Sequence, residues 1–149
     1  MFRKLEGGGA ELVFAAISKE SKKVNRDLYY AKMMDNEWSK PVPLTNINGP
    51  AYESHPAFSP DGKALVFSSD RKGGYGEIDL YISERNPDGT WGEPRNLGMA
   101  INTDKEEITP FIADDGSLLF ASKGYSKGDF QILRAEKVPG VWDWINPHK

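Results

Sequence analysis

Short apolar segments recur along this chain at a fixed interval, each bounded by turn-forming residues. Leu12-Val13-Phe14 returns as Leu65-Val66-Phe67 and again as Leu118-Leu119-Phe120, so the three copies start 53 residues apart. The same interval separates the pairs Trp38 with Pro41, Trp91 with Pro94 and Trp144 with Pro147. A repeat of this length indicates one supersecondary unit per copy, stacked on its neighbours.

The central copy shows the expected elements most clearly. Residues 55–59 form a short apolar segment that ends at Pro60-Asp61-Gly62, a turn in which proline presets φ and glycine accepts a positive φ. A β-rich segment over 64–69, another over 78–83 and an extended piece over 91–97 follow, with further glycine-containing turns between them. Four short segments with tight turns predict one antiparallel sheet of four strands.

Both faces of this sheet are apolar. Side chains alternate along a strand, so Leu65 and Phe67 point to one face and Val66 to the other. Burying both faces requires a sheet on each side, and four-stranded sheets fanned around an axis form a β-propeller. We therefore predict an all-β chain, a single propeller segment over residues 1–149, built of about three four-stranded antiparallel blades with approximate repeats 1–50, 51–104 and 105–149.

Longer motifs in the central copy carry a family resemblance. They are His55-Pro56-Ala57-Phe58-Ser59-Pro60-Asp61-Gly62-Lys63, the segment 65–71, and Gly76-Glu77-Ile78-Asp79-Leu80-Tyr81 followed by the segments 91–98 and 101–103. Together they resemble the PD40 (WD40-like) propeller repeat, which also builds the TolB propeller. The long form is similar to PD40 segments of bacterial cell-envelope proteins that carry OmpA-like or TPR domains.

The outer copies depart from this pattern. The first has Met1 to Leu5 in place of the His-Pro-Ala-Phe strand, and Gly7-Gly8-Gly9 in place of Pro-Asp-Gly. The third has Gln131-Ile132-Leu133 in place of Asp79-Leu80-Tyr81. We align His55 with Phe2 in the first copy and with Thr109 in the third.

Three blades do not close a ring, since propellers typically have four to eight. They would leave two apolar sheet faces and open strand edges, which invite association. Two explanations are compatible with this count. The chain is a fragment of a longer propeller, which its truncated outer copies favour, or two chains associate as a homodimer that closes a six-bladed ring.

Composition and charge exclude several classes. The 19 basic and 22 acidic residues give a net charge of −3, without the basic excess of a nucleic-acid-binding protein. No run of about eighteen apolar residues predicts a membrane span. The chain has no cysteine, so disulfides and thiolate metal sites are impossible. Residues 1–6 are not followed by the apolar stretch of a signal peptide.

Catalytic chemistry is not indicated. No serine lies in a Gly-x-Ser-x-Gly elbow, and the only histidines are His55 and His148. His55 is expected to face the central channel or to cap the entry of an inner strand. Paired carboxylates near the propeller axis would suit glycoside hydrolysis, but we interpret the acids of the entry loops as solvated; these are Glu53, Asp104, Glu106 and Glu107. The acidic residues do not have EF-hand spacing, so we expect no metal site. We also expect no cofactor.

Aromatic residues offer a second kind of site. The three tryptophans at the repeat interval could stack sugars, but we expect them to clamp each outer strand to a neighbouring blade. Trp142 lies outside the interval and is the better candidate for an exposed aromatic.

The loops between second and third strands differ most among the copies. They span 18–26, 70–78 and 123–130, and each carries basic residues, those of the first being Lys19, Lys22, Lys23 and Arg26. Loops on a rigid scaffold collect function, and Arg and Tyr are frequent in binding hot spots. We therefore nominate as partner-binding residues Arg71, Lys72, Tyr75, Lys123, Tyr125 and His55. A solvated hairpin tip is the competing interpretation.

The function expected from these features is non-catalytic. We expect a scaffold module that binds a protein partner or a cell-wall component through propeller-face loops. The family resemblance implies a periplasmic or outer-membrane-associated parent protein. From the charge and the lack of a long apolar run we expect no nucleic-acid partner and no direct membrane insertion. Two alternatives remain: the propeller portion of a larger peptidase or carbohydrate-active enzyme, and a structural self-assembly module.

Overall fold

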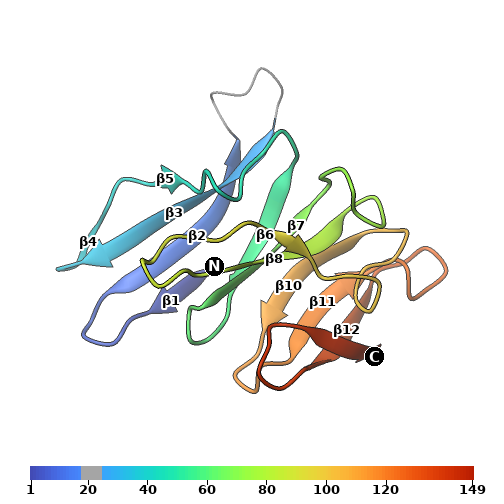
Figure 1. Ribbon diagram of the computed structural model, residues 1–149. Coiled ribbons are helices and arrows are strands. Elements are labelled where there is room, and N and C mark those ends of the chain that lie inside the picture. Colours follow the sequence, from blue (N-terminus) through green and yellow to red (C-terminus); the bar gives the residue numbers. More distant parts are fainter. Residues whose placement is uncertain (18–24) are drawn as a thin grey trace.

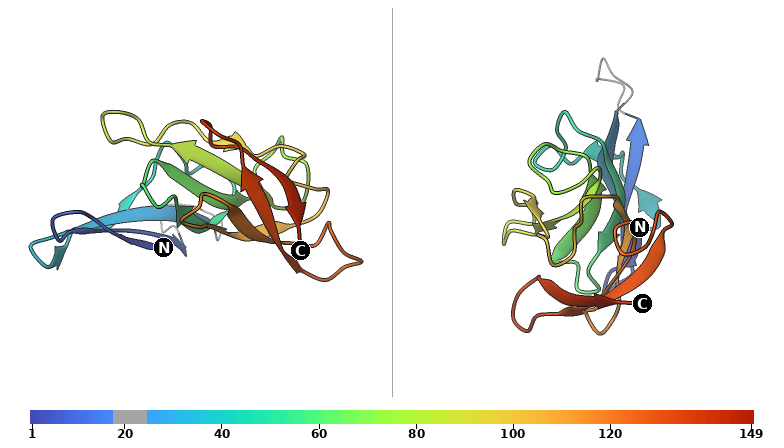
Figure 2. Two further views of the ribbon diagram at one scale, coloured as in Figure 1. Left: turned by 90° about the horizontal axis from the view of Figure 1, so that it is seen from below. Right: turned by 90° about the vertical axis from the view of Figure 1, so that its right-hand side faces the viewer.

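A computed structural model describes residues 1–17 and 25–149, and these form three antiparallel sheets that fan out in chain order (Figures 1 and 2). Blade 1 contains β1 (Phe2–Lys4), β2 (Ala10–Ile17), β3 (Arg26–Met34), β4 (Glu37–Trp38) and β5 (Val42–Pro43). Blade 2 contains β6 (Glu53–Phe58), β7 (Ala64–Ser69), β8 (Asp79–Glu84) and β9 (Arg95–Asn96). Blade 3 contains β10 (Glu107–Ile112), β11 (Leu118–Ser122), β12 (Gln131–Lys137) and β13 (Trp144–His148). The chain is therefore all-β, with the blades of a partial β-propeller.

Alternation along β7 builds two separate cores, as predicted. Leu65 and Phe67 lie in the core shared with blade 1, beside Val13. Val66 lies in the core shared with blade 3, beside Phe120. Blade 2 therefore packs on both neighbours, with its sheet between them (Figure 1).

The turn chemistry of the hairpins follows the sequence. Gly62 and Gly116 adopt positive φ values of 71° and 84°, a region that residues with a Cβ avoid. Beside the first turn, the Ser59 hydroxyl and the Lys63 amide both donate to the Asp61 carboxylate, at 2.6 and 3.0 Å. Each Asp-Gly turn thus ends a strand sharply and returns the chain into the same sheet.

An asparagine fastens each blade-to-blade connection of the described chain to the third strand. Asn102 accepts a hydrogen bond from the Leu80 amide and donates to the Leu80 carbonyl, at 2.8 and 3.0 Å. Asn48 makes the same two bonds with Leu28, at 2.8 and 2.9 Å. The connections leaving blades 1 and 2 are therefore held in equivalent positions.

The outer strands and their tryptophans depart from prediction in places. The expected strand over 91–97 reduces to β9 and an isolated bridge at Trp91, because Pro94 has no amide for the ladder. Trp91 and Trp144 are buried as expected, but Trp38 is 44% exposed because no described blade covers it. The expectation that Trp142 is exposed was wrong, since it is half-buried against Trp144.

Among the described residues, no helix is long and apolar enough to span a membrane.

Candidate functional site

Four connecting segments gather at one end of the three sheets and form what we call the loop face. Antiparallel topology places the connections between second and third strands at the same end as those between blades. Within the described chain the loop face consists of residues 44–52, 70–78, 97–106 and 123–130. The predicted basic loop that begins at Ser18 lies largely outside the described residues.

A buried carboxylate organises the loop 70–78. Asp79 is 1% exposed and accepts hydrogen bonds from the amides of Tyr75 and Gly76, at 2.6 and 3.1 Å. The Asn96 side chain donates to the same carboxylate at 2.8 Å. Gly74 passes so close that a Cβ there would lie 2.2 Å from Asp79 Oδ2. The loop is thus shaped by an acid at its base and by a glycine that leaves room for it.

The same loop is also tied to the connection that enters blade 3. The Glu77 amide donates to the Lys105 carbonyl at 3.0 Å, and the Glu107 amide donates to the Ile78 carbonyl at 2.8 Å. A Cβ at Gly76 would lie 2.2 Å from the Lys105 carbonyl oxygen. Anchored on both sides, the loop leaves the Tyr75 side chain 49% exposed.

Arg71 and Lys72 are neighbours with different surroundings. The Arg71 guanidinium lies over the Phe67 and Tyr81 rings, with 5.1 and 4.8 Å to their centroids. It also donates to the Ile47 carbonyl at 2.9 Å and to the Glu53 carboxylate at 3.1 Å. Arg71 therefore holds the connection between blades 1 and 2, whereas Lys72 is exposed.

Glu53 and Glu107 are fully buried, so the expectation of solvated acids at these positions was wrong. Ser69 and Arg71 hydrogen-bond to Glu53, while burial raises its pKa above the ordinary value despite the Arg71 charge. The Ser122 hydroxyl donates to Glu107 at 2.5 Å. Each glutamate bridges the first strand of its blade to the second, because the serine stands opposite it in the ladder. The other two acids remain near the surface, with Asp104 exposed and Glu106 half-buried.

The two nominated residues of blade 3 are partly enclosed. Lys123 pairs with Glu106, with 2.5 Å between Nζ and Oε1, and its Nζ lies 4.8 Å from the centroid of the Phe130 ring. Tyr125 packs edge-on against Phe120. Its pKa is raised mainly by burial and also by the nearby charge of Glu107. Neither side chain is presented as openly as Tyr75.

His55 lies on β6, the edge strand of blade 2 that contacts both neighbouring blades. It adopts a φ of 49° at an irregularity in the β6–β7 pairing, and Thr109 repeats this with 52° in blade 3. Its Nδ1 lies 3.0 Å from the Ser54 hydroxyl, and burial together with the Arg26 charge lowers its pKa. Within the described part of the chain, the His55 ring has hydrogen-bonding contacts with serine hydroxyls alone, and no cluster of three metal-ligating side chains occurs.

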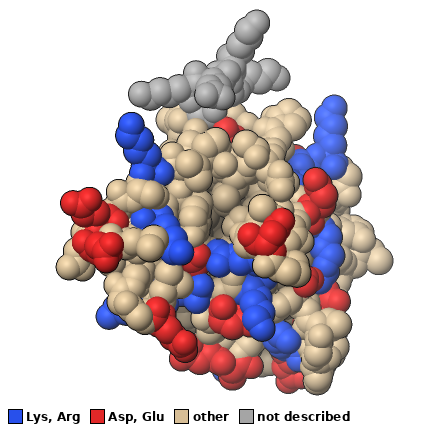
Figure 3. Space-filling view, turned by 60° about the vertical axis from the view of Figure 1, so that its left-hand side comes forward, with Lys and Arg blue, Asp and Glu red and all other residues tan. Residues whose placement is uncertain are grey.

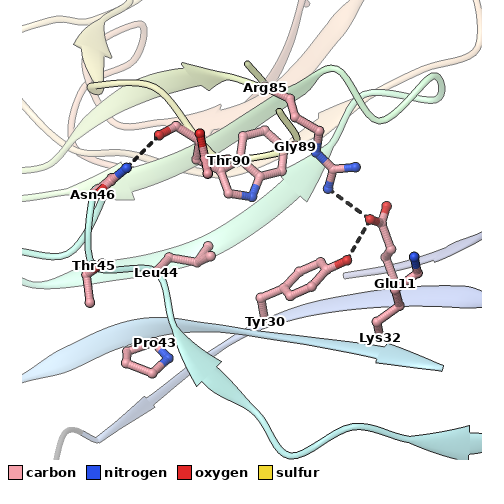
Figure 4. A pocket seen from close by; sticks show the side chains of 11 residues that line it. Glu11, Tyr30, Lys32, Pro43, Leu44, Thr45, Asn46, Arg85, Gly89 and Thr90 are labelled. Carbon is pink, nitrogen blue, oxygen red and sulfur yellow. Dashed lines mark hydrogen bonds and ion pairs between the residues drawn. The ribbon is translucent and has the colours of Figure 1, made fainter. Parts of the chain in front are cut away.

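Two hollows lie along the junction of blades 1 and 2. The first, about 700 Å³, is on the loop face and is lined by residues 46–51 and 70–72 together with Glu53, Glu93 and Pro94. The second, about 480 Å³, lies toward the opposite ends of the strands and is lined by side chains of both blades, including Tyr30, Arg85 and Trp91 (Figure 4).

An ion-pair network missed by sequence reasoning lines the second hollow. Glu11 is 3% exposed, lies 2.9 Å from Arg85 and accepts a hydrogen bond from the Tyr30 hydroxyl (Figure 4). It also lies 2.6 Å from Arg3. Burial alone would raise the pKa of Glu11, but the bonds from Tyr30 and the arginines lower it, while burial and Glu11 raise the pKa of Tyr30 to about 12. One signal was present, since the other copies have alanine or serine where Glu11 stands.

On the face drawn in Figure 3, charge is mixed rather than segregated. Acidic and basic side chains are interspersed over this face. This agrees with the nearly balanced count of 19 basic and 22 acidic residues. A partner of mixed polarity suits such a surface better than a polyanion does.

Comparison with known proteins identifies the fold. No family model matches the chain, and no curated protein matches it. A solved structure, TolB from Acinetobacter baumannii, is similar with a TM-score of 0.52 and 22% sequence identity over 85% of this chain. The chain spans 27% of the length of that protein. The similarity shows that these three sheets have the arrangement of β-propeller blades.

Proposed function

We propose that this chain is a non-catalytic binding module of the bacterial cell envelope, periplasmic or associated with the outer membrane. It holds a protein partner or a cell-wall component on the loop face. The observation that carries this proposal is the anchored loop 70–78, which presents Tyr75 from a backbone fixed by Asp79 and by the connection into blade 3. The resemblance to PD40 repeats of envelope proteins supports the location.

A fixed loop favours binding for an energetic reason. Ordering a mobile loop on association costs free energy, and a loop already held in one shape avoids most of that cost. Tyrosine contributes a large rigid contact with few rotatable bonds, which is why it recurs in binding hot spots. Tyr75 is therefore the strongest anchor on the loop face among the nominated residues.

The hollow beside this loop adds a recess for the partner. Lys72 lines it together with Asp70 and Glu93, so both signs of charge meet there. Mixed charge around an aromatic anchor suits the polar rim and hydrophobic centre of protein interfaces. We therefore favour a protein over a polysaccharide.

The test uses the full chain on a solid support. Envelope extract and purified peptidoglycan of the source organism are passed over the wild type, Tyr75→Ala and Lys72→Glu. Lys63→Glu, an exposed change in the hairpin turn at the opposite end of blade 2, is the control. Loss of an anchor of about 1.4 kcal/mol or more reduces retention about tenfold. Equal retention by Tyr75→Ala and wild type, or no specific retention by any of them, would overturn the proposal.

A further inference from the structure

The junction of blades 1 and 2 is marked by two aromatic pairs on the face of blade 2 that meets blade 1. Phe58 stacks on Trp91 with 5.9 Å between ring centroids, and Phe67 stacks on Tyr81 with 6.1 Å. All four residues are at most 6% exposed. A blade face that is covered by its neighbour thus buries both aromatic pairs.

Blade 1 carries the same two pairs on its face turned away from blade 2. Phe2 meets Trp38 with 6.3 Å between centroids, and Phe14 stacks on Tyr29 with 5.9 Å. The strand register shows the equivalence, because Phe2 stands opposite Leu12 as Phe58 stands opposite Leu65. This register also corrects the alignment of Phe2 with His55. Yet Phe2 is 47% exposed and Trp38 44%, so among the described residues no blade covers this face.

In both junctions of the described chain, the face with the large apolar side chains is covered by the preceding blade. The preceding blade makes this contact with the face that points away from its own aromatic residues. Val13 and Leu28 of blade 1 pack into the core with Phe67, and Val66 and Leu80 of blade 2 pack into the core with Phe120. A complete junction therefore joins a face bearing aromatic or large apolar side chains to one bearing smaller aliphatic side chains.

Blade 3 has an uncovered face that is equivalent to the aliphatic face with which blade 2 covers blade 3. Leu119 and Ile132 occupy the positions of Val66 and Leu80, by the register of β11 with β12 and of β7 with β8. Ile132 is 65% exposed, and Phe111, which stands opposite Leu119, is 48% exposed. The described residues thus leave two faces uncovered, and these match the two halves of the internal junctions.

We infer that a second copy of this chain covers both faces, with blade 3 of each copy packed on blade 1 of the other. The contact continues the junction pattern already present between blades 1 and 2 and between blades 2 and 3. A head-to-tail contact of unlike faces forms a closed ring when the rotation closes. Two copies of three blades give six, within the range in which propellers close. This contact lies on the sheet faces and is independent of the loop face.

The test is the solution mass of the full chain, measured by light scattering after size exclusion. The expected mass is twice 16.6 kDa. Trp38→Glu and Ile132→Glu each place a carboxylate in the proposed contact at an exposed position, and each should reduce the mass to that of the monomer. Met99→Glu, at an apolar residue 74% exposed on the loop face, is the matched control and should stay dimeric.

Circular dichroism and cooperative unfolding of each variant separate loss of association from loss of folding. Folded monomers of Trp38→Glu and Ile132→Glu beside a dimeric Met99→Glu support the ring. A monomeric wild type at about 100 μM, a wild type that forms open polymers, or a dimer that withstands both substitutions would overturn it.

Discussion

Removing the side-chain amide of Asn102 should destabilise the protein more than the same change at Asn48. Both side chains make the same pair of bonds with the backbone of the third strand. In Asn102→Ala the buried Leu80 amide loses its acceptor, while the Leu80 carbonyl keeps the bond from the Leu97 amide at 3.0 Å. An unsatisfied buried donor costs about 1 to 3 kcal/mol. Loss of the bonds that Asn102 donates to the Leu80 carbonyl and to the Asn96 side chain adds about 1 kcal/mol in all. We expect a total of about 2 to 4 kcal/mol.

The comparison with Asn48 sharpens this expectation. Asn102 is 2% exposed, whereas Asn48 is half-buried, so water can replace its side chain and Asn48→Ala should cost about 1 kcal/mol. Asn102→Asp keeps the acceptor but faces the Leu80 carbonyl with an ionised oxygen that cannot donate. It should therefore be less stable than wild type at pH 7 and should recover as pH falls and the introduced carboxyl becomes protonated.

Urea unfolding followed by tryptophan fluorescence measures these differences, since a loss of about 4 kcal/mol still leaves a typical domain folded. The reasoning fails if Asn102→Ala costs less than about 0.5 kcal/mol, or if Asn48→Ala costs more than Asn102→Ala. Failure of Asn102→Asp to recover at low pH would show that the carbonyl contact is not the cause of its loss.

Three further changes probe the site and its surroundings. Glu11→Gln leaves the half-buried Arg3 and Arg85 without their counter-charge and should lower the free energy of unfolding by about 2 kcal/mol. The exposed Glu84→Gln should cause no change, and equal effects of the two substitutions would contradict a network built on a buried carboxylate. Gly74→Ala forces a methyl group against the Asp79 carboxylate and should speed amide exchange across residues 70–78, and unchanged exchange would refute the close approach. The pKa of His55 is held below its usual 6.5, so its contribution to stability is present above pH 6.5 and is lost as the pH falls below it. His55→Gln should abolish that part of the pH dependence of unfolding, and identical pH profiles of wild type and variant would contradict it.

The blades were predictable because their signals are local. Alternation at Leu65, Val66 and Phe67 gives the two sheet faces directly, and the Asp-Gly turns give the hairpins. No comparison between distant segments was needed beyond the repeat itself. Sequence patterns of this kind predict which elements exist, and here they also predicted how neighbouring sheets share their cores.

The burial of the acids was not predictable in the same way. Glu53 is buried because Ser69 and Arg71 come to it from the next strand and loop, and Glu11 is buried because Arg85 reaches it from blade 2. Charged residues are normally exposed unless they are paired, and the pairing depends on strand register and on which blade faces reach each other. The local amino-acid composition shows neither the strand register nor which blade faces reach each other.

The same limit applies to the nominated site. A basic residue followed by a Gly-Tyr pair does not show that Arg71 lies over two aromatic rings while Lys72 and Tyr75 face outward. Those differences depend on Asp79 and on the contact of the loop with blade 3.

Amide hydrogen exchange at Tyr75 and Gly76 in the free protein tests most directly whether the loop 70–78 is a fixed surface or a solvated hairpin tip. Both amides donate to the buried Asp79 carboxylate. A fixed loop predicts exchange slowed at least about a hundredfold relative to an unstructured peptide, as for amides that open only with the surrounding strands. Exchange near the unprotected rate would contradict a preformed loop and with it the basis for binding through this face.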